Sequence, residues 1–159
     1  MKHVLTTLLM LMATLPMMAQ QKTEKPYNEE INAMEQIDKA IADAQKDGKY
    51  VICQVGGNWC PWCLRFNDFI HADEEIAGMI AKDYVYIHVN YSPKAKNPEA
   101  MKRLGNCTRF GFPVLVVLDN QGNVIHIQDS GYLEEDKGYN KEKVVRFFKN
   151  WSPEAVQGK

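Results

Sequence analysis

YVICQVGGNWCPWC, residues 50–63, joins an apolar run to a pair of cysteines that are two residues apart. The nearly unbroken apolar character of Tyr50 to Val55 predicts a central strand that is covered on both faces. The glycine pair Gly56-Gly57 follows, and Cys60 and Cys63 come where the strand gives way to a helix. A C-x-x-C pair in this place is suited either to exchange electrons or to hold a metal ion. The rest of the sequence has to distinguish these two uses.

Length and composition limit the class of protein. The chain has 159 residues, of which 45% are hydrophobic and 25% are charged, which predicts one domain with a proper core. The formal net charge is -1, and charges of both signs are interspersed. We therefore expect no nucleic-acid partner and no electrostatic attraction to an anionic membrane.

Residues 1–19 have the pattern of a cleavable signal peptide. A basic start, Met1-Lys2-His3, precedes an apolar stretch from Val4 to Leu15, and Ala19 is a small residue before the polar Gln20. The apolar stretch is shorter than the roughly 20 residues of a membrane-spanning helix, which disfavours a membrane anchor. We therefore expect export to a periplasmic or secreted location, with cleavage near Ala19. Because disulfides persist in such compartments, export favours redox chemistry over zinc binding at the cysteine pair.

The rest of the chain divides into three parts. Residues 20–30 are polar and predict a tether, residues 31–152 predict a folded domain, and residues 153–159 predict a C-terminal tail. Hydrophobic periodicity within the domain predicts the order helix, strand, helix, strand, helix, strand, strand, helix, with strands at 50–55, 84–89, 113–118 and 124–128. Helices between strands predict parallel crossovers, and the turn around Gly122 predicts one antiparallel pair. The expected class is α/β, with a mixed central sheet of about four to five strands sandwiched by helices.

Three features together resemble the thioredoxin-like superfamily. They are Trp59-Cys60-Pro61-Trp62-Cys63 after the first strand, Gly111-Phe112-Pro113 at the start of the third, and the hairpin from Asp119 to Gly122, which Gly131 follows. The resemblance covers about residues 30–151, and the motif is similar to that of the secreted branch of the family. It implies a thioredoxin fold and an exported thiol-disulfide oxidoreductase that acts on protein or peptide disulfides. It also implies that the Cys60-Cys63 disulfide is the redox group, with no cofactor and no metal, and that a membrane or periplasmic protein exchanges electrons with it.

The place of the two cysteines predicts different roles for them. A cysteine at a helix N-terminus faces unpaired backbone N–H groups and the positive end of the helix dipole, which lowers its pKa. Cys60 is therefore the expected nucleophile, and Pro61 fits the first helical turn because its missing N–H is not needed there. Cys63, one turn later, is placed to attack the mixed disulfide that Cys60 forms with a substrate.

Five residues are candidates for positioning the substrate. Trp59 and Trp62 predict an apolar collar around the thiols; in the alternative interpretation Trp59 packs against the domain, which we favour for that residue, and Trp62 is exposed and has no role. The resemblance implies that Pro113 follows a cis peptide bond and lies against the two cysteines. It also implies that the residue before it, Phe112, offers backbone hydrogen bonds to an extended substrate. Pro61, between the two thiols, completes the expected contact surface.

The sequence departs from the family below the cysteine pair. Thioredoxins have a buried acid six residues before the first cysteine, which assists proton transfer from the second, and Gln54 stands at that position here. Glutamine does not ionise, so another group or water has to replace the acid. His88 on the next predicted strand is a candidate because a histidine pKa lies near neutral pH. The alternative, which we favour, is that His88 is a hydrogen-bonded strand residue.

Two more cysteines lie outside the motif. With Cys60 and Cys63 paired, Cys53 and Cys107 are the only partners for a second disulfide. A strand-interior cysteine seldom has the geometry that a disulfide demands, so we expect both to be buried free thiols.

Two other functions remain open from the residues alone. A structural zinc site takes four ligands, and no second C-x-x-C or histidine pair accompanies Cys60 and Cys63. A peptide-binding or chaperone-like module would present Trp62 and Phe112 to partners without using the thiols. We favour the oxidoreductase, in the reducing or isomerising direction.

Overall fold

The apolar run that begins at Tyr50 forms the central strand of the sheet. In the computed structural model, which describes residues 25–158, β1 (Tyr50–Gly56) is buried along its whole length. The expected signal peptide lies outside the described residues. The other elements are α1 (Ala33–Asp47), α2 (Pro61–Ala72), α3 (Glu74–Asp83), β2 (Tyr84–Asn90), α4 (Pro98–Arg103), η1 (Cys107–Phe110), β3 (Val114–Leu118), β4 (Val124–Asp129), η2 (Ser130–Leu133), β5 (Glu134–Glu135), β6 (Gly138–Tyr139), α5 (Lys141–Asn150) and α6 (Pro153–Gln157).

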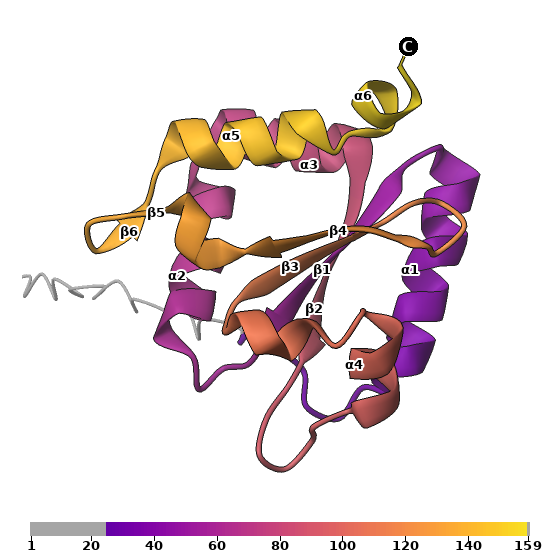
Figure 1. Cartoon of the computed structure of the whole chain (residues 1–159), viewed down its shortest axis with the longest axis vertical. Helices are drawn as coiled ribbons and strands as arrows, with labels where there is room; N and C mark the ends of the chain where they lie inside the picture. The colour runs from indigo at the N-terminus through magenta and orange to yellow at the C-terminus, as the bar shows by residue number, and fades with distance from the viewer. Residues whose placement is uncertain (1–24, 159) are drawn as a thin grey trace, which may run out of the picture.

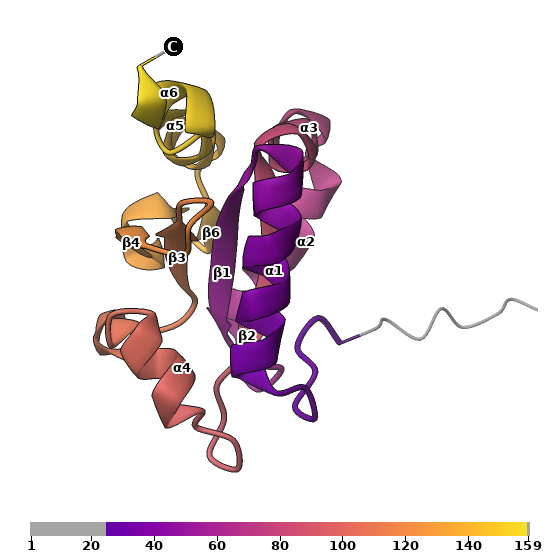
Figure 2. The same ribbon diagram turned by 90° about the vertical axis from the view of Figure 1, so that its right-hand side faces the viewer.

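The main sheet has four strands in the order β2-β1-β3-β4 (Figures 1 and 2). β1 and β2 are parallel, whereas β3 runs antiparallel to both β1 and β4. The mixed sheet confirms the predicted fold class, and the predicted hairpin joins β3 to β4. The Asp119 carboxylate closes this hairpin because its Oδ1 accepts the backbone N–H groups of Gln121 and Asn123, both at 2.9 Å.

The prediction of a parallel crossover between β2 and β3 is wrong. Asn90 at the end of β2 pairs with Gly56, and Val114 at the start of β3 pairs with Val55, so the chain leaves and re-enters the sheet at the same end. α4 has six residues and spans about 9 Å, which is too short to run back along a seven-residue strand of about 23 Å. This end of the sheet is also where α2 begins at the cysteine pair.

Helices cover the two faces of the sheet (Figures 1 and 2). α1 and α4 pack on the face that carries Val51, Cys53 and Val55, and α2, α3 and α5 pack on the face that carries Ile52 and Leu115. This alternation along one strand produces two separate cores from a single apolar run. Among the described helices, none combines the length and the apolar character needed to cross a membrane.

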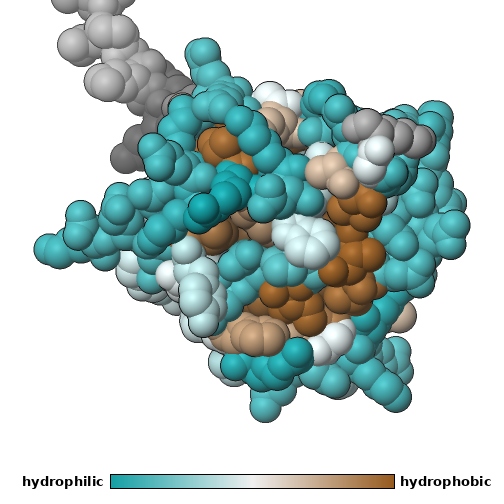
Figure 3. Space-filling view, turned by 45° about the horizontal axis from the view of Figure 1, so that its top comes forward, coloured by the Kyte–Doolittle hydropathy of each residue, from teal (hydrophilic) through white to brown (hydrophobic). Residues whose placement is uncertain are grey.

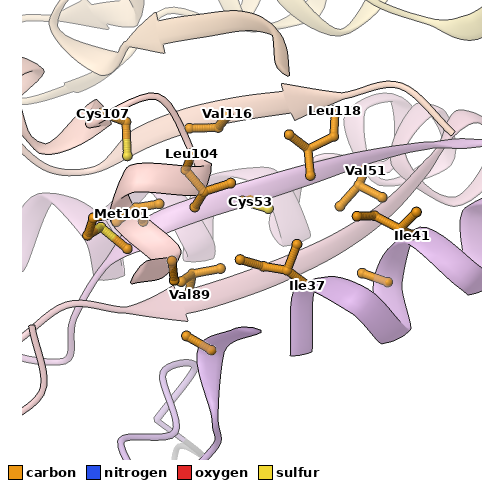
Figure 4. Packing of buried hydrophobic residues seen from close by; sticks show 14 of the residues in the cluster. Ile37, Ile41, Val51, Cys53, Val89, Met101, Leu104, Cys107, Val116 and Leu118 are labelled. Carbon is orange, nitrogen blue, oxygen red and sulfur yellow. The ribbon is translucent and has the colours of Figure 1, made fainter. Parts of the chain in front are cut away.

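Cys53 and Cys107 are free thiols in the core beneath α1 and α4, which confirms the expectation (Figure 4). Both are fully buried. Burial raises the pKa of Cys53 well above its usual range and raises the pKa of Cys107 to about 11. Both therefore remain protonated near neutral pH and act as small hydrophobic residues.

The chain ends differ from the sequence-based boundaries. α1 begins after Asn32, whose side chain accepts the backbone N–H groups of Met34 and Glu35, so Ile31, the first residue of the expected domain, precedes the helix. The expected C-terminal tail contains α6, which Ser152 caps.

α5 lies on the face seen in Figure 3, which is mostly hydrophilic with a stripe of hydrophobic residues.

Candidate active site

Cys60 and Cys63 form a disulfide at the N-terminus of α2. Their Cα atoms are 5.2 Å apart, and Cys60 is the N-cap residue, whose Sγ accepts the backbone N–H of Cys63 at 3.2 Å. Pro61 occupies the first turn and is exposed. Cys60 is 5% exposed and Cys63 is fully buried, so Cys60 is the sulfur that a partner reaches. These positions fit an attacking Cys60 and a resolving Cys63.

Gly56 lets the backbone of β1 approach the inner sulfur. A Cβ atom at this position would collide with Cys63 Sγ and would lie 3.0 Å from the hydroxyl oxygen of Tyr27. The glycine is therefore required by the close approach of the strand to the disulfide.

Gln54 is the centre of a buried polar network below the disulfide. Its side chain is fully buried, and its Nε2 donates to the hydroxyl of Tyr27 at 2.6 Å and to the carbonyl of Cys63 at 3.1 Å. Its Oε1 accepts the hydroxyl of Tyr86 at 2.5 Å. Neutral side chains thus fill the place where the family has an acid.

Tyr27 is a residue of the site that no motif in the sequence indicates. This residue falls in the stretch assigned to a polar tether, yet it is 2% exposed and packs in one cluster with Cys60 and Cys63. Asn58 holds the segment against the domain, because it donates to the Tyr27 carbonyl at 2.6 Å and accepts the Tyr27 N–H at 3.2 Å. A single aromatic residue in a polar segment has no periodicity, so the only available signal was the large apolar side chain itself.

His88 lies beside this network without joining it. It pairs with Gln54 across β1 and β2, and its ring stands edge-on to Tyr27 and Tyr86, with centroids 5.1 and 5.5 Å away. Its Nε2 is buried and has no hydrogen-bond partner among the described residues. Burial, and to a smaller extent the charge of His71, lowers the pKa of His88 to about 4. The ring is therefore neutral near pH 7 and a poor proton acceptor.

We predict that His88 makes the protein less stable in mild acid. The unfolded chain takes up a proton at this residue below about pH 6.5, whereas the folded chain stays neutral down to about pH 4. Stability is therefore lost as the pH falls through this window, by up to about 1.4 kcal/mol per pH unit. Urea unfolding of the parent and of His88→Gln between pH 7 and 4.5 measures the difference. The same pH dependence in both proteins would contradict the prediction.

Trp59, Tyr91 and Phe112 form an aromatic group beside the cysteine pair. Trp59 is 49% exposed, and its Nε1 donates to the carbonyl of Tyr91 at 2.7 Å. Phe112 stands edge-on to Trp59 at 5.4 Å, stacks on Tyr91 at 5.0 Å and packs against the cluster of the two cysteines. The Phe112-Pro113 peptide bond is cis, as the resemblance implied.

The two tryptophans differ from the alternative interpretation of the motif. Trp62, which the alternative interpretation leaves exposed, is partly buried: its ring stands edge-on to Tyr139 at 5.6 Å, and the Arg65 guanidinium lies 4.6 Å above it. Trp59, the expected packing residue, is the more exposed of the two. Trp62 is the second residue of α2 and its ring packs against Tyr139, whereas Trp59 lies in the loop before the helix. The residues from 25 to 158 contain no group of three or more His, Cys, Asp or Glu side chains placed to hold a metal ion.

Known proteins share this architecture. The model of the thioredoxin-like family matches residues 32–120, and no curated protein matches the sequence. A disulphide isomerase from Xylella fastidiosa Temecula1 is 24% identical and superposes with a TM-score of 0.70 over 79% of this chain and 95% of its own. A thioredoxin from Thermus thermophilus is 17% identical and superposes with a TM-score of 0.55 over 77% of this chain and 88% of its own. DsbH oxidoreductase is 19% identical and superposes with a TM-score of 0.51 over 69% of this chain and 77% of its own. At these identities the solved structures show a common fold, and the family model, which spans more than half of the sequence, shows that the chain belongs to the thioredoxin-like family.

Proposed function

We propose that this protein is an exported thiol-disulfide oxidoreductase that reduces or isomerises protein disulfides through Cys60 and Cys63. The observation that carries the proposal is the Cys60-Cys63 disulfide at the N-terminus of α2, in which Cys60 is slightly exposed and Cys63 is fully buried. The similarity to a disulphide isomerase and to an oxidoreductase of the same fold supports this class of reaction. Export rests on the signal-peptide pattern of residues 1–19.

The reaction consists of two thiol-disulfide exchanges. The Cys60 thiolate attacks a substrate disulfide, so that a Cys60–substrate bond forms, the substrate S–S bond breaks and one substrate thiolate leaves. Cys63, as a thiolate, then attacks Cys60 Sγ, which forms the Cys60-Cys63 bond and releases the second substrate thiolate. The substrate gains two electrons and the protein pair loses two. A dithiol protein of the membrane or periplasm is the proposed donor that reduces the pair again.

The surface beside Cys60 suits an unfolded chain. Phe112 packs against the cluster of the two cysteines, and the half-exposed Trp59 ring stands edge-on to it; aromatic residues are enriched where proteins bind peptides. The hydrogen bond from Trp59 to Tyr91 holds its ring in place before binding, which limits the side-chain entropy lost on binding.

Reduction of insulin disulfides by dithiothreitol, with and without the protein, tests the proposal. We expect the protein to accelerate the reaction at substoichiometric amounts, because the Cys60 thiolate is the better nucleophile, and we expect alkylation of the reduced protein to remove this acceleration. Isomerisation of a scrambled disulfide protein tests the second direction. Peptide binding without catalysis in either assay would favour a peptide-binding module and would overturn the proposed function.

A further inference from the structure

We propose that the Tyr27 hydroxyl donates a hydrogen bond to the Cys63 sulfur in the reduced protein, and that Gln54 directs it there as a positioning residue. This inference rests on the proposed function for its role in catalysis, and it assigns a task to the neutral network that stands in place of a buried acid.

The direction of the network leaves the Tyr27 proton free. The Cys63 carbonyl can only accept, so the Gln54 nitrogen faces it, and the Gln54 oxygen accepts from Tyr86 on the other side. Gln54 then uses its second N–H on the oxygen of Tyr27. The Tyr27 hydroxyl therefore accepts one hydrogen bond and keeps its own proton, for which the oxidised structure has no acceptor within residues 25–158.

The hydroxyl lies where a thiolate of Cys63 would accept it. Tyr27 Oη and Cys63 Sγ both lie close to the same point above Gly56, the position of the Cβ atom that this glycine lacks. Tyr27 and Cys63 are almost completely buried and belong to one cluster. A hydrogen bond formed in this water-poor place is stronger than one at the surface, and an unpaired thiolate there is correspondingly costly.

Tyr27 acts as a donor and not as a base. Burial raises its pKa above the usual value of 10, although the hydrogen bond from Gln54 opposes this rise. The phenol therefore stays protonated at neutral pH. The proton that Cys63 loses passes to the substrate thiolate released in the first exchange, whose pKa is of the same order. The Tyr27 hydroxyl then stabilises the Cys63 thiolate and lowers its pKa while the sulfur attacks Cys60.

Titration of Cys63 in the Cys60→Ser protein tests the hydrogen bond without requiring activity. Cys53 and Cys107 do not interfere near neutral pH, because burial raises the pKa of both. Thiolate absorbance should show that Tyr27→Phe raises the Cys63 pKa by about one unit, a tenfold loss of thiolate below the pKa. The matched control is Tyr84→Phe, which removes another buried hydroxyl, bonded to the Phe148 carbonyl. An unchanged Cys63 pKa in Tyr27→Phe, or an equal rise in the control, would overturn the proposal.

A second measurement does not depend on the folding of the Tyr27 variant. In the Cys60→Ser protein with Tyr27 intact, the proton NMR signal of the Tyr27 hydroxyl should move downfield as Cys63 ionises. Contacts with the Gln54 side-chain amide identify this signal. A signal that does not move over the Cys63 titration would contradict the proposed bond.

The rate of the resolving step distinguishes a hydrogen bond from a general structural defect. At a given pH, a thiol of higher pKa is ionised to a smaller extent, but its thiolate is a better nucleophile. The nucleophilicity of the thiolate rises with its pKa with a Brønsted slope of about 0.4 to 0.5. Below the Cys63 pKa, Tyr27→Phe should therefore release the substrate from a preformed Cys60–substrate disulfide about threefold more slowly than the parent. Well above that pKa, the variant should release the substrate faster than the parent. A rate lowered equally at every pH would indicate a structural defect and overturn the assignment. If Cys63 titrates as expected but insulin is not reduced, the proposed function fails and the hydrogen bond stands.

Discussion

Cys60→Ser is expected to lower the reduction of protein disulfides to the uncatalysed background. Cys60 is the sulfur nearest the surface and caps α2, where the helix dipole and the Cys63 N–H stabilise a thiolate. A serine hydroxyl at this place stays protonated and does not attack a disulfide. The insulin assay measures the loss. The stability of Cys60→Ser is compared with that of Cys63→Ser, which lacks the same disulfide. Activity equal to that of the parent would refute the role of Cys60.

Cys63→Ser supplies the complementary result. The variant keeps the attacking sulfur and loses the resolving one, so a mixed disulfide between Cys60 and the substrate should accumulate. Non-reducing gel electrophoresis with a disulfide-bonded substrate detects this species, which a reductant should release. If Cys60→Ser traps the substrate instead, the roles of the two cysteines are reversed.

Gly56→Ala is expected to lower the free energy of unfolding by about 1–3 kcal/mol, because its new methyl group collides with Cys63 Sγ. The sulfur is tied to Cys60 and enclosed by the core, so it has little room to move. Gly78 in α3 is a matched control, since a Cβ atom there meets nothing within 4 Å. Gly78→Ala should raise stability by about 0.5–1 kcal/mol, because glycine is a poor helix former.

Urea unfolding of the two oxidised alanine variants measures both effects on one scale. Opposite signs are expected because both substitutions add the same methyl group and differ only in what surrounds it. Equal stability of Gly56→Ala and the parent would show that Cys63 can move aside. The proposed place of the Tyr27 hydroxyl beside that sulfur would then need revision as well.

The neutral network under the disulfide separates this site from one built on a buried acid. Gln54 fixes the Cys63 carbonyl and the Tyr27 hydroxyl, and both tyrosines that bond it have pKa values raised by burial. No group in this network changes charge near neutral pH. The pH dependence of the two exchanges is therefore expected to follow the thiols of Cys60 and Cys63 alone.

The sequence by itself determined the features that depend on neighbouring residues. Alternating and unbroken apolar runs specified the four strands of the main sheet, and the spacing of Cys60 and Cys63 after β1 specified the disulfide at a helix N-terminus. The cis bond before Pro113 followed from the resemblance in its local motif. These features are local because strand period, helix period and the position of a cap are properties of a few consecutive residues.

Only the tertiary structure decided what happens between distant segments. Tyr27, Gln54 and Tyr86 are far apart in the chain and meet because β1 and β2 pair in register and the segment before α1 folds onto the end of the sheet. The antiparallel direction of β3 and the exposure of Trp59 relative to Trp62 likewise depend on how separate segments pack against one another. Burial, hydrogen-bond partners and pKa values are set by such long-range contacts, which no periodicity encodes. The cysteine pair could therefore be found in the sequence, whereas the groups proposed to control its protons could be found only in the fold.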